Sequence, residues 1–186
     1  MHRRRHGPSC RTAGFTLIEA MIALLVTSLL LGLAVPAWSN ASEAARAVAA
    51  RAAMQDTLDE AMRHAAIAGT EVVVCPGTDA CRDTWDWSGG WLAWADANGN
   101  RHRDAGESML VRAPALPGRV HLRSTRGRRR LVLRPHGGAA AGTNVTFTLC
   151  DGRGPSRTVA LVLANSGRLR DARPGAAAVA ECLGPA

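Results

Sequence analysis

The sequence predicts an α+β protein in which one long N-terminal helix is followed by an antiparallel β-sheet domain. Three observations support this fold class. An unbroken apolar run covers residues 15–35, an alanine-rich segment of helical period covers 39–68, and the rest of the chain divides into short apolar segments separated by Gly, Pro, Asn and Asp. Because a chain of 186 residues suits one domain with an appendage, we expect the second half of the helix to pack on the sheet domain.

The apolar run is long enough to cross a bilayer as a helix, which needs about 20 apolar residues. We therefore expect residues 15–37 to be the transmembrane part of the helix. The four arginines of residues 1–14 form a basic stretch in front of it, as in a signal peptide or membrane anchor. Glu19 lies inside the run, and an ionisable group in a membrane helix usually has a partner because it is costly to bury alone.

The helical period continues beyond the apolar run. Leu58, Met62 and Ala65 recur at helical spacing, which predicts a face that packs on the sheet domain. Asp59 and Arg63 are one turn apart and are expected to form an ion pair. Gly69 follows the last periodic residue, so the helix is expected to end there.

Beyond Gly69 the pattern becomes that of short strands with turn residues between them, and few helical patterns remain. The predicted strands cover residues 71–75, 91–95, 109–112, 120–123, 130–134, 145–150, 158–164 and 168–171.

The charge is divided unevenly along the chain. The formal net charge is +8, and every cationic side chain other than histidine is an arginine. Residues 15–111 hold six arginines against twelve acids, whereas residues 112–173 hold thirteen arginines against Asp151 and Asp171 only. A basic half on an otherwise acidic chain suggests an anionic partner, and arginine suits phosphate because its planar group offers two parallel hydrogen bonds.

Five cysteines are present, of which Cys10 lies in the basic stretch at the front. The other four, Cys75, Cys81, Cys150 and Cys182, allow two disulfides in an oxidising compartment. Three pairings are possible, and proximity favours Cys75 with Cys81 and Cys150 with Cys182. A zinc site is the weaker alternative, because neither pair has the ligand spacing common in zinc knuckles.

The junction between the basic stretch and the apolar run carries the segment Gly14-Phe15-Thr16-Leu17-Ile18-Glu19. This segment resembles the prepilin peptidase motif of the type IV pilin superfamily. The resemblance implies that residues 1–14 are a leader removed after Gly14, that Phe15 becomes the methylated N-terminus, and that its amine pairs with a carboxylate such as Glu19 on a neighbouring helix. An ordinary signal peptide cut after Ala37 is the alternative.

This resemblance implies several partners and a location. Prepilin peptidase, other pilin subunits of a filament and the inner membrane are expected as partners. The chain is then a single-pass inner-membrane protein with residues 15–68 as its helix and residues 69–186 as a periplasmic β-rich domain, assembled into a pilus or pseudopilus.

The segment Trp87-Ser88-Gly89-Gly90-Trp91, together with the polar residues of 96–107, resembles the FimT/GspH branch of minor pilins and pseudopilins. The same polar stretch imitates a calcium-binding loop, whose candidate oxygen ligands are Asp96, Asn98, Asn100, Asp104 and Glu107. Calcium loops of this type need a sharp turn at their sixth position, usually a glycine, and Arg101 stands there. A polar turn between two strands accounts for the same residues, and no metal is expected.

Trp85, Trp87, Trp91 and Trp94 are close together in the sequence. Tryptophans can stack on bases, but within a strand pattern they usually pack in the core. We expect packing, because a small domain without tyrosine needs other large side chains. The scattered histidines match no nucleophile or metal motif, and no phosphate-binding glycine loop is present, so neither catalysis nor a cofactor is expected.

Two arginine clusters are candidates for binding an anion. One contains Arg126, Arg128, Arg129 and Arg130, and the other contains Gly167, Arg168, Arg170 and Arg173. In a strand, alternation places Arg168 and Arg170 on one face, about 6.5–7 Å apart, which suits consecutive phosphates. The Gly-Arg-x-Arg pattern of Gly167, Arg168 and Arg170 resembles the DNA-binding motif of FimT-type minor pilins, which implies a role in natural transformation.

Arginine clusters are often only solvated faces of a protein. Here the nearby acids are too few in the sequence to neutralise them, which favours DNA bound non-specifically, although anionic lipid or lipopolysaccharide would present similar charge. A different functional class is a structural minor pseudopilin of a type II secretion system at the tip of its filament. The arginine motif favours the FimT side of the branch.

Overall fold

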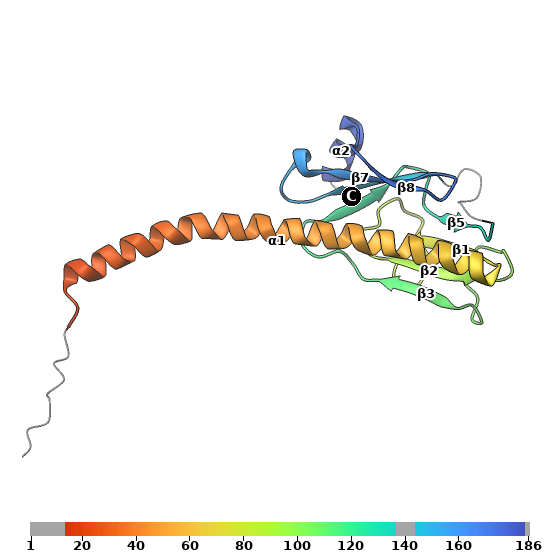
Figure 1. Ribbon diagram of the computed structural model, residues 1–186, viewed down its shortest axis with the longest axis horizontal. Helices are drawn as coiled ribbons and strands as arrows, with labels where there is room; N and C mark the ends of the chain where they lie inside the picture. The colour runs from red at the N-terminus through yellow and green to blue at the C-terminus, as the bar shows by residue number, and fades with distance from the viewer. Residues whose placement is uncertain (1–13, 137–143, 185–186) are drawn as a thin grey trace, which may run out of the picture. The chain divides into compact units, whose positions relative to one another are not determined.

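The computed structural model describes residues 14–136 and 144–184 (Figure 1). Apart from Gly14, the predicted leader with Cys10 lies outside these residues. The elements, in chain order, are α1 (Leu17–Ala68), β1 (Glu71–Pro76), β2 (Trp91–Asp96), β3 (Met109–Ala113), β4 (His121–Ser124), β5 (Leu131–Leu133), β6 (Val145–Cys150), the 3-10 turn η1 (Pro155–Arg157), β7 (Val159–Leu163), β8 (Leu169–Ala172) and α2 (Ala176–Leu183). The eight predicted strands are therefore confirmed, with ends that move by at most one residue. The chain forms two compact units, Met1–Ser39 and Asn40–Ala186.

The described part of the first unit consists mainly of the first turns of α1. Its apolar side chains are exposed, and α1 is long and apolar enough to cross a membrane. Thr16 precedes the helix, and its hydroxyl accepts a hydrogen bond from the Glu19 N–H at 3.3 Å. This hydrogen bond satisfies one of the backbone donors that every helix leaves free at its first turn.

The second unit contains residues 40–68 of α1 and two antiparallel four-stranded sheets (Figure 1). Sheet A has the strand order β3-β2-β1-β5, and sheet B has the order β4-β6-β7-β8. The chain passes from sheet B to sheet A between β4 and β5, and returns to sheet B at β6. The predicted fold class, a long helix followed by antiparallel sheet, is confirmed.

One core joins α1 to the inner faces of both sheets. Met54 and Leu58 of α1 are fully buried there, among side chains of β1, β2, β5, β6 and β7. Trp91 donates its indole N–H to the Thr57 hydroxyl at 3.0 Å, and Trp87 packs edge-on against Phe147. Trp87, Trp91 and Trp94 are all buried, as predicted from the strand pattern, whereas Trp85 is half-buried.

The ion pair predicted on α1 is wrong in its acidic partner. Arg63 pairs with Glu60 at 2.5 Å rather than with Asp59. Glu60 lies three residues before Arg63, and Asp59 lies four residues before it. Both spacings place the acid on the same helical face as Arg63, and in the structure the ion pair forms at the three-residue spacing. The helix ends as predicted, because Gly69 has a φ of 68° and donates its N–H to the Ala65 carbonyl.

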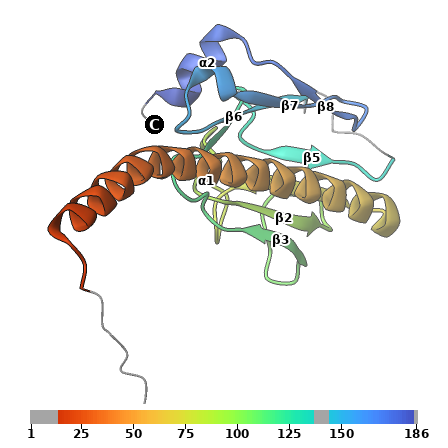
Figure 2. The same cartoon turned by 60° about the vertical axis from the view of Figure 1, so that its left-hand side comes forward.

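Helix α2 was not predicted. Its eight residues follow a Pro-Gly pair and consist largely of alanine, so they carry no clear period. It packs on β4 and β6, and Figure 2 shows it on the side of sheet B that faces away from α1. Non-local contacts hold it in place, namely the Cys150–Cys182 disulfide and a hydrogen bond from Arg123 to the Gly184 carbonyl at 3.0 Å. The second disulfide joins Cys75 to Cys81, so the pairing is the one that proximity favours.

The stretch 96–107 forms a polar turn between β2 and β3. The buried Asp96 carboxylate accepts backbone N–H groups of Gly99 and Arg101 at 2.8 and 2.9 Å. Glu107 accepts the N–H groups of Ala97 and Asp104, both at 3.0 Å. The carboxylates therefore accept hydrogen bonds from the turn's own backbone, as expected of a polar turn between two strands.

Two asparagines complete this turn by binding the Asp104 carboxylate. Asn98 and Asn100 donate their side-chain amides to it at 2.7 and 2.8 Å. These hydrogen bonds lower the pKa of Asp104 below its usual value.

Candidate nucleic-acid interface

The arginines of the Gly-Arg-x-Arg motif lie on the hairpin that joins β7 to β8, at the edge of sheet B. Ala164 donates its N–H to the Arg168 carbonyl at 3.0 Å, which closes the turn, and Gly167 within it has a φ of 80°. This left-handed conformation is strained for other residues, so the glycine of the motif has a structural role in the hairpin.

The strand register fixes the direction of the motif side chains. Leu169 is paired with Leu163 and packs against the core, whereas Arg170 is paired with Val162. Because side chains alternate along a strand, Arg168 and Arg170 share the face of sheet B opposite the core, and both are exposed. The predicted alternation is thus present in the structure.

Arg128 reaches the same end of sheet B from the other edge. Its guanidinium donates to the carbonyl and side-chain oxygen of Asn144 at 3.0 and 3.2 Å. Asn144 in turn donates its N–H to the side-chain oxygen of Asn165, in the β7–β8 turn, at 2.9 Å. Arg128 is therefore linked to the hairpin that carries Arg168.

A row of paired positions connects the two edges. Thr125, directly after β4, donates its N–H to the Thr146 carbonyl at 2.9 Å, Thr146 is paired with Val162, and Val162 is paired with Arg170. Since neighbouring strands lie about 4.8 Å apart, three steps separate the two edges by about 14 Å. We call Arg126, Arg128, Arg168 and Arg170 the basic end of sheet B.

Arg126 is partly neutralised within this group. Its guanidinium lies 5.3 Å from the centre of the Trp85 ring and forms an ion pair with Glu181 of α2. Arg123 lies on the same ring at 4.9 Å and is buried, and it faces Asp86 at 3.7 Å. The pair with Glu181 borders a cavity of about 270 Å³ between α2 and sheet B.

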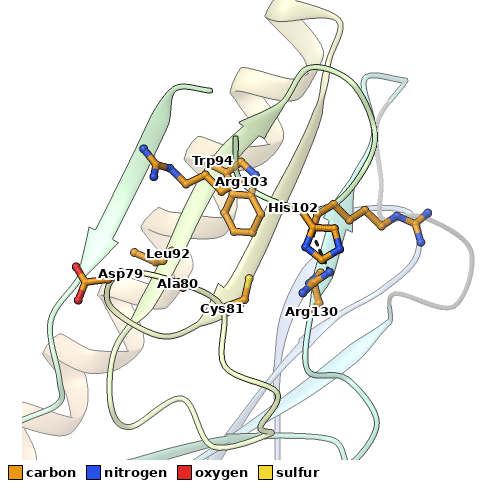
Figure 3. A pocket seen from close by; sticks show the side chains of 9 residues that line it. Asp79, Ala80, Cys81, Leu92, Trp94, His102, Arg103 and Arg130 are labelled. Carbon is orange, nitrogen blue, oxygen red and sulfur yellow. Dashed lines mark hydrogen bonds between the residues drawn. The ribbon is translucent and has the colours of Figure 1, made fainter. Parts of the chain in front are cut away.

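Arg129 and Arg130 are separated from the basic end of sheet B. The chain crosses to sheet A at this point, and Arg129 pairs with Asp83 at 2.6 Å while Arg130 donates to the Arg101 carbonyl at 2.9 Å. Figure 3 shows Arg130 beside His102, at the side of a cavity of about 320 Å³ on sheet A. The floor of this cavity includes the buried Leu92 and Trp94.

Arg173 is exposed in the segment between β8 and α2. Within residues 14–136 and 144–184, the side chains of Arg168, Arg170 and Arg173 have neither a hydrogen-bond partner nor an ion-pair partner. The motif arginines therefore carry unneutralised charge.

Other arginines of the basic half do find acids, contrary to the expectation from sequence proximity. Arg112, Arg129 and Arg134 pair with acids of the acidic half, and Arg126 pairs with one from the C-terminal helix. The pairs are Arg112 with Asp79, Arg129 with Asp83, Arg134 with Glu71, and Arg126 with Glu181. The fold brings together charges that are distant in the sequence, so the solvated and unpaired arginines are fewer than the sequence suggests.

The processing motif lies at the start of α1. Gly14, Phe15 and Glu19 are exposed, with Phe15 at 84%. Residues 10–35 match the family model described as the prokaryotic N-terminal methylation motif. Together with the long apolar helix and the antiparallel sheets, this match defines a type IV pilin-like subunit of the minor pilin or pseudopilin class.

Residues 50–167 match the family model described as type II transport protein GspH, and the chain belongs to this family. Membership implies assembly with other pilin subunits, processing by prepilin peptidase and an inner-membrane anchor. The family is structural rather than catalytic in general character.

The comparison with solved structures supports the fold through one match with a TM-score above 0.5. The Pseudomonas aeruginosa type IV minor pilin FimU is similar with a TM-score of 0.53 and 16% identity, over 71% of this chain and 89% of that chain. The Vibrio cholerae type 2 secretion minor pseudopilin EpsH matches with a TM-score of 0.48 and 15% identity, over 69% of this chain and 96% of that one. No curated protein matches the sequence significantly.

Proposed function

We propose that this protein is a minor pilin of a type IV pilus that binds DNA non-specifically during DNA uptake in natural transformation. One observation carries the proposal: Arg168 and Arg170 are exposed and unpaired within the described chain, on one face of an edge hairpin. Arg128 and Arg126 extend the same basic surface across about 14 Å of sheet.

The chemistry of this surface suits a phosphate backbone. Guanidinium groups bind phosphate oxygens with paired, charge-assisted hydrogen bonds. Phosphate contacts do not read the base sequence, so the affinity for DNA is expected to depend on salt concentration rather than on sequence. Arg173 adds a further exposed charge beside the motif. Arg129 and Arg130 are the members of the predicted set least suited to bind DNA, because their side chains bind Asp83 and the Arg101 carbonyl near sheet A.

The N-terminal part of the proposal concerns processing and orientation. Cleavage after Gly14 removes residues 1–14, and methylated Phe15 becomes the N-terminus. Its amine pairs with Glu19 of a neighbouring subunit when the helices assemble, which compensates two charges in an apolar surrounding. Residues 69–186 then form the periplasmic domain, where the oxidising environment favours both disulfides.

Binding of the detergent-solubilised full chain to fluorescent DNA duplexes of two unrelated sequences tests the DNA part. We expect equal affinities for the two duplexes within a few-fold. Affinity should fall by about tenfold or more between 50 and 200 mM salt, if about two or more phosphates are contacted. Fluorescence anisotropy measures both. A marked preference for one duplex, or no binding at 50 mM salt, would contradict the proposal.

A structural pseudopilin of a type II secretion system is the second candidate. The description of the matched family, a type II transport protein, favours it. The same titration separates the two, because this candidate requires no DNA binding. A location of the gene among secretion genes rather than pilus-assembly genes would also favour it.

A further inference from the structure

A second basic cluster lies where the globular unit begins. A cavity of about 520 Å³ is lined by Asn40, Ala41, Arg153, Ser156 and Arg157. It therefore brings the turn between β6 and β7 against the first residues of this unit. The cavity mouth offers arginine side chains, a serine hydroxyl and an asparagine amide, all of which can donate hydrogen bonds.

Helix α1 and the loop between β3 and β4 each add one arginine to this region. Arg46 of α1 pairs with Glu43 at 3.1 Å and lies against Gly118. The Arg119 guanidinium lies directly against Gly152, in the space that a side chain at that position would occupy. Arg46, Arg119, Arg153 and Arg157 therefore form one group, which we call the proximal cluster.

Two acids neutralise only part of this charge. Glu43 holds Arg46, and the buried Asp151 holds Arg153 at 2.7 Å. Burial alone would raise the pKa of Asp151, but hydrogen bonds from Arg153 and the charges of Arg153 and Arg119 outweigh it and lower the pKa. Asp151 is thus ionised at neutral pH and occupied by Arg153.

Arg119 and Arg157 are the free members of the cluster. Both are exposed, and neither forms an ion pair within the described residues. The cluster therefore has a net positive charge whose accessible part is two guanidinium groups.

The globular unit begins only a few residues after the end of the apolar run. The apolar run ends near Ala37, and the exposed Trp38 follows it, a residue type that is enriched at the membrane–water interface. Asn40 comes three residues after Ala37, a rise of about 4.5 Å along a helix. The interfacial layer on each side of the hydrocarbon core is about 5–7 Å thick, so chain connectivity alone keeps the backbone of Asn40, one of the residues that line the cavity, close to headgroup depth.

We propose that the proximal cluster binds the phosphate headgroup of an anionic phospholipid, with Arg119 and Arg157 as its main ligands and Ser156 and Asn40 as additional donors. This site is independent of DNA binding and uses a different end of the domain. The contact with the headgroup holds the globular unit at the membrane surface before the subunit is assembled. Extraction of the subunit from the bilayer into a filament would break this contact.

The test uses the full chain in detergent micelles that contain phosphatidylglycerol or phosphatidylcholine as the probe lipid. Native mass spectrometry measures how much of each lipid stays bound. We expect phosphatidylglycerol to bind about tenfold better, since each juxtamembrane arginine contributes substantially to attraction by anionic lipid. Arg119→Gln with Arg157→Gln should reduce this preference to about twofold or less.

The matched control is Arg101→Gln with Arg103→Gln, which removes the same charge from the loop between β2 and β3 and should keep the preference. Arg119→Lys with Arg157→Lys, which retains the charge, should keep most of it, and circular dichroism of the glutamine variant checks that this variant is folded. The proposal is overturned by either of two results: no lipid preference in the unmodified chain, or an equal loss in the control.

Discussion

The combined substitution Arg168→Ala and Arg170→Ala is expected to weaken DNA binding by at least about tenfold at 50 mM salt. Each lost guanidinium removes about one phosphate contact, and hydrogen bonds to charged groups contribute about 1.5–3 kcal/mol. The slope of log affinity against log salt should also become shallower by about two units, since each contact releases about 0.9 counterion. Fluorescence anisotropy over a salt series measures both quantities.

The matched control for this prediction is Arg129→Ala with Arg130→Ala. It removes the same net charge, but from side chains that bind Asp83 and the Arg101 carbonyl. We expect its affinity to change by less than about threefold, because long-range electrostatics is largely screened at the ionic strengths used. An equal loss in both variants would mean that net charge alone, rather than the basic end of sheet B, governs binding.

Removing the disulfide between Cys150 and Cys182 by serine substitution is expected to lower the free energy of unfolding by about 4 kcal/mol. The bond closes a loop with a sequence separation of 32 residues, and loop-closure entropy in the unfolded chain sets this magnitude. It also holds α2 on sheet B, so the pair between Arg126 and Glu181 should lose its order. Urea denaturation followed by circular dichroism measures the change.

The disulfide between Cys75 and Cys81 provides an internal comparison, because it closes a loop with a separation of only 6 residues. Its removal should lower the free energy of unfolding by about 2 kcal/mol. If the serine variant of the longer loop fails to fold, reduction of the Cys75→Ser, Cys81→Ser variant by dithiothreitol breaks only the Cys150–Cys182 bond and gives the same comparison. A larger effect for the shorter loop would contradict the entropic explanation.

The strands and the long helix were predictable because their signals are local. Apolar segments between turn residues located all eight strands, and Gly69 marked the end of α1 through its own backbone conformation. Helix α2 lacked such a signal, since it has only eight residues and half of them are alanine, which leaves no clear apolar period. A disulfide to β6 and hydrogen bonds from Arg123 hold it, and these contacts come from distant parts of the sequence.

The candidate site was predictable only in part for the same reason. Alternation along one strand was enough to place Arg168 and Arg170 on one face, because that rule needs no knowledge of the rest of the fold. The four arginines of 126–130 look like one cluster in the sequence, but the chain changes sheets within it. Arg126 and Arg128 remain with sheet B, whereas Arg129 and Arg130 turn to groups near sheet A.

Charge pairing shows this limit most clearly. The basic half holds only two acids, Asp151 and Asp171, and yet several of its arginines are paired. The acids come from residues 71–83 and from Glu181, which the sheets and α2 bring close. Sequence distance therefore underestimates neutralisation, and the structure reduces the candidate DNA surface to the arginines that remain free or only partly engaged.

Arginine footprinting tests the central claim, the DNA surface at the basic end of sheet B, most directly. Phenylglyoxal modifies accessible guanidinium groups, and mass spectrometry of the full chain measures the modification rate at each arginine with and without a DNA duplex. We expect DNA to slow modification of Arg168 and Arg170 most, and of Arg128 to a smaller extent, while Arg103 reacts at an unchanged rate. Protection of Arg103 and Arg130 with no effect at Arg168 and Arg170 would contradict the account.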